Sequence, residues 1–194
     1  MPDRPHCKTQ LREELRRQRR ALSPHEQSAA ARAAAFNITR IPSWPTARSI
    51  ALYLASDGEI DTSAVSANCR AAGKQLFLPV IGDTNLMEFA EWTQGERLTA
   101  NRYGIPEPPR TARRCSVEAL DIIVLPLVGW DSTGGRLGMG GGFYDRALAG
   151  VKGPLLVGLA HAVQQLPRVP RDDWDVPLDY VVTDSALHCC QGRN

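Results

Sequence analysis

The chain has 194 residues, of which 43% are hydrophobic and 23% are charged, and its 23 basic and 21 acidic side chains give a net charge of +2. This composition is that of a folded globular protein and excludes an intrinsically disordered chain. The charge balance does not demand nucleic acid as a partner, no apolar run approaches the ~20 residues of a membrane span, and the N-terminal segment lacks the apolar stretch of a secretion signal. We therefore expect one cytoplasmic, monomeric domain over residues 1–194, without a nucleic-acid or membrane partner.

The first part of the chain is predicted to be helical. Leu11, Leu15 and Leu22 follow helical spacing. The sequence Ser23-Pro24-His25-Glu26 combines an N-cap residue, a proline in the first turn and the acid of a capping box. A second helix is therefore expected from about Pro24 to Ile38.

Beyond a proline-rich connector, the pattern changes to short apolar runs separated by helix-compatible segments such as 62–73. The runs lie at 49–55, 75–80, 120–128 and 154–160, with further strands expected at 86–92 and 180–183. Near-continuous apolar strands that alternate with helices indicate a mainly parallel sheet covered on both faces. The predicted fold class is therefore α/β: a three-layer, Rossmann-like domain with N-terminal helices. Residues 93–116 hold three prolines and are predicted to be a long ordered loop, of a kind that is often functional.

The densest chemical signal is the glycine-rich stretch GGRLGMGGGFYDR at 134–146, between an apolar strand and a helix predicted at about 142–148. In this arrangement bare backbone N–H groups can surround a phosphate, and Arg136 adds a forked cation. The pattern is neither a Walker A motif, because no Gly-Lys-Ser/Thr follows, nor a dinucleotide fingerprint, because Phe143 stands where the third glycine belongs. Glycine richness alone fits a mobile surface loop equally well.

RLGMGGGFYDR at 136–146 resembles the signature loop of the 5-formyltetrahydrofolate cyclo-ligase family, also called 5,10-methenyltetrahydrofolate synthetase. The resemblance covers nearly the whole chain, because four weaker pieces occur in the family's order: Lys8-x-x-x-Arg12, GEID at 58–61, GIPEP at 104–108 and VPLDYVVT at 176–183. It implies that ATP and Mg²⁺ drive the ring closure of 5-formyltetrahydrofolate to 5,10-methenyltetrahydrofolate. In the implied mechanism the N5-formyl oxygen attacks the γ-phosphate, N10 attacks the carbon of the resulting iminium phosphate, and inorganic phosphate leaves.

The resemblance also implies a role for particular residues. Those implied at the ATP phosphates are Lys8, Arg12, Arg136, Leu137, Gly138, Met139, Gly140, Gly141, Gly142, Phe143 and Tyr144, with Arg136 and Tyr144 as the expected catalytic pair. Those implied at the folate are Leu54, Glu59, Tyr103, Met139 and Phe143. Those implied as Mg²⁺ ligands are Asp145 and Asp179, because hard carboxylate oxygens suit this ion. In some relatives Met139 and Gly141 are basic residues, so backbone amides would have to do more here.

Patterns alone leave simpler interpretations open. Lys8, Arg12 and Arg16 share one helical face, which is typical of a solvated basic surface, and a nucleic-acid arm is a further alternative that Glu13 and Glu14 interrupt. The alternative functions are a nucleotide- or folate-binding protein without turnover and a nucleic-acid binder.

The remaining polar and aromatic residues suggest no site. The cysteines show no CxxC spacing and the histidines no HxxxH or HExxH pairing, so neither zinc nor a disulfide framework is expected. The four tryptophans are expected to pack in the core or at its rim. Asp172, Asp173 and Asp175 are interpreted as solvated loop charges, and Cys189–Cys190 as a frayed, reduced tail.

Overall fold

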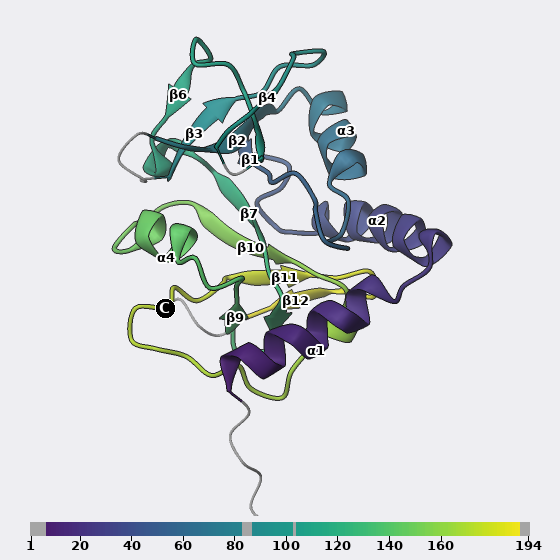
Figure 1. Cartoon of the computed structure of the whole chain (residues 1–194). Coiled ribbons are helices and arrows are strands. Elements are labelled where there is room, and N and C mark those ends of the chain that lie inside the picture. Colours follow the sequence, from purple (N-terminus) through teal and green to yellow (C-terminus); the bar gives the residue numbers. More distant parts are fainter. Residues whose placement is uncertain (1–6, 83–86, 103, 191–194) are drawn as a thin grey trace, which may run out of the picture.

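The computed structural model describes residues 7–82, 87–102 and 104–190, and an eight-stranded sheet runs through it (Figure 1). In sheet order the strands are β12 (Leu187–Cys189), β11 (Tyr180–Val182), β10 (Leu155–Leu159), β7 (Ile122–Pro126), β1 (Ser49–Ala51), β2 (Gln75–Ile81), β3 (Met87–Glu91) and β6 (Arg114–Cys115). The strands from β11 to β2 are parallel to their neighbours, and β12, β3 and β6 are antiparallel additions at the two edges. The predicted mainly parallel sheet is confirmed.

Helices cover both faces of this sheet and make three layers. Two helices, α2 (Pro24–Ile38) and α3 (Ser63–Ala71), lie on one side, and the short α4 (Phe143–Leu148) lies on the other (Figure 1). Successive residues of a strand point to opposite faces. Accordingly Ile122 packs in the cluster with α2 and α3, and Ile123 packs in the cluster with Leu148 of α4.

The start of α2 shows how local sequence sets an element boundary. The Ser23 hydroxyl accepts a hydrogen bond from the Glu26 N–H, and the Glu26 carboxylate accepts one from the Ser23 N–H at 2.7 Å. Both partners of the predicted capping box are therefore formed, with proline in the first turn.

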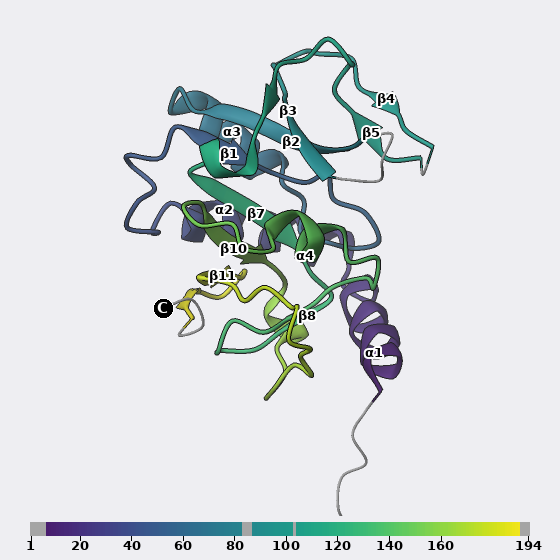
Figure 2. The ribbon, with the colours of Figure 1, turned by 90° about the vertical axis from the view of Figure 1, so that its left-hand side faces the viewer.

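The first helix, α1 (Lys8–Arg20), lies beside the three layers and next to a hairpin of β8 (Gly129–Trp130) and β9 (Arg136–Leu137) (Figure 2). Leu15 is buried against Val128, which directly precedes β8, and against Leu137 of β9. The first helix is thereby packed directly against the hairpin that carries the glycine-rich loop.

The structure corrects three expectations. Residues 93–116 are more than a loop, because β4 (Thr99–Ala100) pairs with β5 (Pro106–Glu107), and β6 joins the main sheet; strands of two residues are too short to give a periodic signal. Cys189 lies in β12 and the Cys190 N–H bonds to the Asp179 carbonyl, so this pair is not a frayed tail. Trp174 is 70% exposed and does not pack.

The described helices include none that is long and apolar enough to cross a membrane.

Candidate active site

A cavity of about 1310 Å³ opens where the order of the strands reverses. The chain moves from β1 to β2 in one direction and from β7 to β10 in the other, and Leu54 after β1 and Leu127 after β7 both line the cavity. Crevices at such switch points are where open α/β sheets bind ligands. Because a pocket for one small ligand usually measures ~300–1,000 Å³, this cavity has room for two.

The cavity collects most of the residues that the sequence singles out. Those that line it are Lys8, Arg12, Leu54, Glu59, Arg136, Leu137, Gly138, Met139, Gly140, Gly141, Gly142, Phe143, Tyr144 and Asp145. Asp179 does not line it. Tyr103 falls outside the described residues. Segments at both ends of the chain and in its middle therefore meet at one place.

The glycine-rich loop presents unpaired backbone N–H groups to the cavity. Between Met139 and Gly142, no N–H donates a hydrogen bond to another described residue. Gly140 has a φ of +99°, a conformation that residues with a side chain rarely adopt. Two carbonyls of the loop are engaged by arginine side chains: Arg12 Nε donates to the Gly138 oxygen at 2.8 Å, and Arg146 Nη1 donates to the Gly141 oxygen at 3.0 Å. A run of free N–H groups between fixed carbonyls is suited to bind an anion.

The first glycines of the motif have a different task. A Cβ at Gly135 would stand 2.3 Å from Asp131 Oδ2, and the buried Asp131 carboxylate accepts the Gly135 N–H at 2.9 Å. Glycine is needed here because the turn between β8 and β9 closes around an aspartate. The interpretation of 134–146 as one phosphate loop is therefore too broad, and the part exposed to the cavity begins at Arg136.

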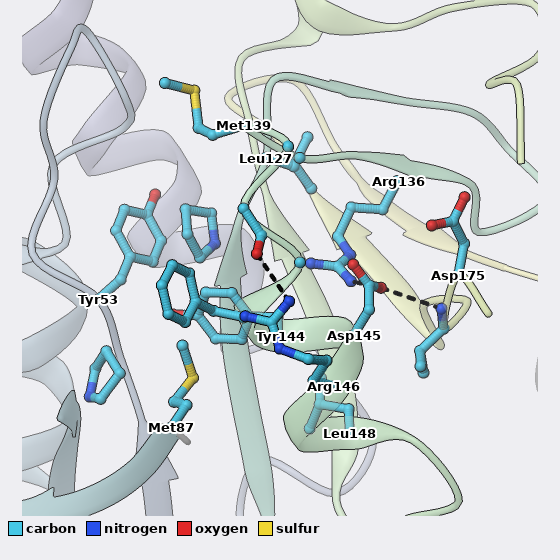
Figure 3. A pocket seen from close by; sticks show the side chains of 18 of the residues that line it. Tyr53, Met87, Leu127, Arg136, Met139, Tyr144, Asp145, Arg146, Leu148 and Asp175 are labelled. Carbon is cyan, nitrogen blue, oxygen red and sulfur yellow. Dashed lines mark hydrogen bonds and ion pairs between the residues drawn. The ribbon is translucent and has the colours of Figure 1, made fainter. Parts of the chain in front are cut away.

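Arg136 and Asp145 bind each other in the wall of the cavity (Figure 3). The Arg136 side chain is only 5% exposed, and its Nε has no hydrogen-bond partner among the described residues. The guanidinium also lies 5.9 Å from the centre of the Tyr144 ring. Burial raises the pKa of Tyr144, so that its hydroxyl stays protonated although the neighbouring Arg136 acts in the opposite direction. The expected catalytic pair is thus adjacent, with the arginine occupied by a carboxylate.

The two predicted metal ligands do not come together. Asp145 Oδ1 accepts from Arg136 and, at 3.3 Å, from the Val176 N–H, whereas Oδ2 accepts no hydrogen bond from a described residue. Asp179 precedes β11, and its carboxylate accepts the Leu156 N–H at 2.7 Å near the start of β10. The parallel strands therefore place Asp179 at their amino ends, on the side opposite to the cavity. The structure therefore places Asp145 at the cavity and Asp179 away from it.

Lys8 is held by loop aspartates. Its Nζ lies 2.6 Å from Asp172 Oδ2 and 3.1 Å from Asp175 Oδ2. Partial burial alone would lower the pKa of Lys8, but these bonds raise it. The interpretation of Asp172 and Asp175 as solvated charges is wrong, because both bind the first turn of α1.

Glu59 lines the cavity and is held in place by its neighbours. Its side chain is 10% exposed, Oε2 accepts the Ser56 N–H at 3.0 Å, and Oε1 lies 3.7 Å from Arg19 Nη2 without a hydrogen bond from any described residue. Burial raises the pKa of Glu59, and the neighbouring Asp57 acts in the same direction.

Arg19 and Asp57 were missed by the sequence analysis. Arg19 is fully buried and donates to the Asp57 carbonyl and carboxylate, each at 2.8 Å, and to the Leu127 carbonyl at 3.2 Å. Arg16 and Arg20 bind the same carboxylate. Burial opposes its ionisation, but the three arginines hold the pKa of Asp57 well below its usual range. The available signal was that Arg19 is four residues from Leu15 and so shares its inward face.

The comparisons agree with this geometry. The family model for the 5-formyltetrahydrofolate cyclo-ligase family matches residues 4–184. The 5-formyltetrahydrofolate cyclo-ligase of Escherichia coli K12 is 38% identical over 179 residues, which are 89% of this chain and 98% of that protein. The mouse protein of the same name is 29% identical over 193 residues, with 93% and 95% covered.

The solved structures give the same answer. The NMR structure of 5,10-methenyltetrahydrofolate synthetase from Aquifex aeolicus superposes with a TM-score of 0.83 and 33% identity, covering 96% of this chain and 95% of that one. Sequence and fold thus agree over nearly the full length of both chains. This chain belongs to the 5-formyltetrahydrofolate cyclo-ligase family.

Proposed function

We propose that this protein uses ATP to close 5-formyltetrahydrofolate to 5,10-methenyltetrahydrofolate, releasing ADP and inorganic phosphate, and that it does so as a monomer in the cytoplasm. The observation that carries the proposal is the run of unpaired N–H groups from Met139 to Gly142, which shares one cavity with the Glu59 carboxylate. One end of the cavity is thus suited to polyphosphate, and the other to the N–H donors of a pterin. The cavity is larger than a single ligand requires, and this size supports the binding of both substrates at once.

The nucleotide phosphates would lie on the glycine loop. Backbone N–H groups of the loop donate to phosphate oxygens, and Lys8 and Arg12 approach from α1. Lys8 must then exchange its bonds to Asp172 and Asp175 for bonds to phosphate. Arg136 gains a partner for its orphaned Nε when an anion binds beside it.

Mg²⁺ fits the Asp145 side of the cavity. This ion usually takes one or two carboxylates and completes its coordination with phosphate oxygens and water. Asp145 Oδ2 meets that need, because it accepts no hydrogen bond from the described residues. When bound there, the ion would neutralise charge on the phosphates.

The folate would lie between Glu59, Leu54 and the exposed side chain of Met139, with Phe143 at the border between the two substrates. The carboxylate of Glu59 accepts hydrogen bonds from the pterin amino and ring N–H groups, because its Oε1 is unshared among the described residues. Tyr103 remains a proposed stacking partner from the sequence resemblance.

The reaction then follows from positions and charges. The N5-formyl oxygen attacks the γ-phosphorus, the bond to ADP breaks, and an iminium phosphate results. N10 attacks the activated carbon, and inorganic phosphate leaves as the new ring closes. Arg136 and the protonated Tyr144 hydroxyl stabilise the charge on the transferred group, and such transfers depend mainly on positioning and electrostatics.

The test is a single assay with two readouts. The purified protein is given 5-formyltetrahydrofolate and ATP with Mg²⁺, and methenyl product and ADP are measured in the same sample. We expect equal amounts of both, and neither when one substrate is omitted. Binding of both ligands without either product would make the protein a binding module, and ADP formation without folate would make it an ATPase.

A further inference from the structure

We propose that Arg19 is a positioning residue for the folate site: it holds the turn at Asp57–Glu59 from behind and fixes the Glu59 carboxylate for the substrate. The inference rests on the proposed function, in which Glu59 contacts the folate. It assigns to the last turn of α1 a task distinct from that of Lys8 and Arg12, which lie at the other end of the same helix.

The geometry of Arg19 joins two walls of the cavity. Through Nε and Nη2 it donates to the carbonyl and carboxylate of Asp57, and through Nη1 it donates to the carbonyl of Leu127. Leu127 lines the cavity directly after β7, and Glu59 lines it from the loop that follows β1. One buried guanidinium therefore sets the distance between the two chain segments that flank the switch point.

The turn that Arg19 holds is an unusual one. Asp57 has a φ of +54° although it is not glycine, and Gly58 follows with a φ of +76°. A left-handed aspartate costs free energy that its surroundings must offset. Here Arg16 and Arg20 bind its carboxylate as well, and the Gly58 carbonyl lies 3.1 Å from His161 Nε2.

Arg19 also lies near Glu59, although its close ion pair is with Asp57. Arg19 Nη2 lies 2.8 Å from Asp57 Oδ2 but 3.7 Å from Glu59 Oε1. Asp57 takes the close ion pair, and Glu59 receives a nearby positive charge that supports its ionised form while Oε1 remains available for a ligand. Had the pair been made directly with Glu59, the substrate would compete with the arginine.

The experiment is a double-mutant cycle on the KM for 5-formyltetrahydrofolate, with the variants Arg19→Gln, Glu59→Gln and the two combined. We expect Arg19→Gln to raise this KM roughly tenfold, within the range of coupled neighbours, while the KM for ATP stays close to the parent value. In the Glu59→Gln background, the same substitution should add little, because the group that it positions is already gone. Arg17→Gln is the matched control, since Arg17 lies on the same helix, is 72% exposed and, among the described residues, pairs only with Glu14.

The outcomes separate the inference from the proposed function. If Glu59→Gln leaves the folate KM unchanged, the folate contact itself is wrong and the inference falls with it. If Glu59→Gln raises it but Arg19→Gln does not, or raises it equally in both backgrounds, only the positioning role is overturned. Should Arg19→Gln fail to fold, Asp57→Asn enters the same cycle with the same expectation, because asparagine tolerates the left-handed conformation and keeps the shape of the turn.

Discussion

The two walls of the cavity are prepared to different degrees. On the wall proposed for the folate, here called the folate wall, Glu59 follows a turn that three arginines and a histidine hold, and its Oε1 accepts no hydrogen bond from the described residues. On the wall proposed for ATP, here called the nucleotide wall, the cations are engaged with the protein's own acceptors, as in the pairs Lys8 with Asp172 and Arg136 with Asp145. A ligand can therefore enter the first wall directly, whereas it must exchange ion pairs in the second. Substitutions should reveal this difference.

Asp145→Asn should have the largest effect, because Asp145 serves both the proposed Mg²⁺ site and the charge of buried Arg136. We expect turnover to fall roughly 100-fold, the scale for loss of one charge-stabilising group. The deciding measurement is ADP binding with and without Mg²⁺. The parent should bind more tightly with the ion, and the variant should show no such gain. An Mg²⁺ dependence equal to the parent's would leave Asp145 with a structural role alone.

Gly140→Ala should damage the nucleotide wall by its backbone. A side chain at a φ of +99° is strained, so the loop must move and its N–H groups lose their alignment. We expect the KM for ATP to rise about tenfold, the effect of ~1.4 kcal/mol, which lies within the ~1–2 kcal/mol of left-handed strain. Gly73→Ala is the matched control, because Gly73 has a φ of +67° at the end of α3, away from the cavity. Gly73→Ala should lower the melting temperature without changing the KM for ATP. Equal KM shifts in both variants would contradict phosphate binding by the glycine-rich loop.

Arg12→Ala should have a moderate effect on the same wall. It removes the hydrogen bond that holds the Gly138 carbonyl and a cation at the cavity. We expect the KM for ATP to rise roughly five- to tenfold, an effect of ~1–1.4 kcal/mol that lies within the ~0.5–1.5 kcal/mol net contribution of a typical hydrogen bond, with the folate KM unchanged. Arg17→Ala, on the exposed side of α1, should change neither. A similar KM for ATP in the two variants would favour the alternative interpretation, in which Arg12 belongs to a solvated basic surface.

The smallest effect is expected from pH on the folate wall. Burial raises the pKa of Glu59 above its usual value of ~4.3, so the carboxylate becomes protonated at a higher pH than an exposed glutamate. Since the ionised form accepts the pterin N–H groups, the folate KM should rise a few-fold as the pH falls toward that raised pKa. The side chain in Glu59→Gln does not ionise, so the variant should lose the pH dependence of the folate KM. If the variant keeps the same rise in KM at low pH, the dependence belongs to another group.

The sequence predicts those elements whose defining residues lie close together in the chain. The start of α2 follows from Ser23 and Glu26, which are three residues apart. The central strands follow from apolar runs, because a buried parallel strand needs both faces apolar. The two-residue strands β4 and β5 carry no period and could not be predicted.

The same distinction holds for the site. The glycine loop is contiguous, so its chemistry could be predicted from one segment. The partners of α1 could not, because Arg19 meets Asp57 across 38 positions and Lys8 meets Asp172 across 164. A helix face can be read from spacing, but its partner depends on topology. The resemblance implied Asp179 as a metal ligand, but its place at the amino end of β11 follows from the strand order and could not be predicted from its neighbours in the sequence.

The position of α1 has a consequence for synthesis of the chain on the ribosome. The helix is made first, yet its partners at Leu127, Gly138 and Asp172 follow 108, 126 and 164 residues after the side chains that bind them. At roughly 5–20 residues per second, the last of these appears about 8–33 s after Lys8. During most of this interval Leu15 lacks Val128 and Leu137, against which it is buried, whereas Asp57, the partner of Arg16, Arg19 and Arg20, has already been made. The first of the described helices is therefore secured only after Leu127, Gly138 and Asp172 have been synthesised.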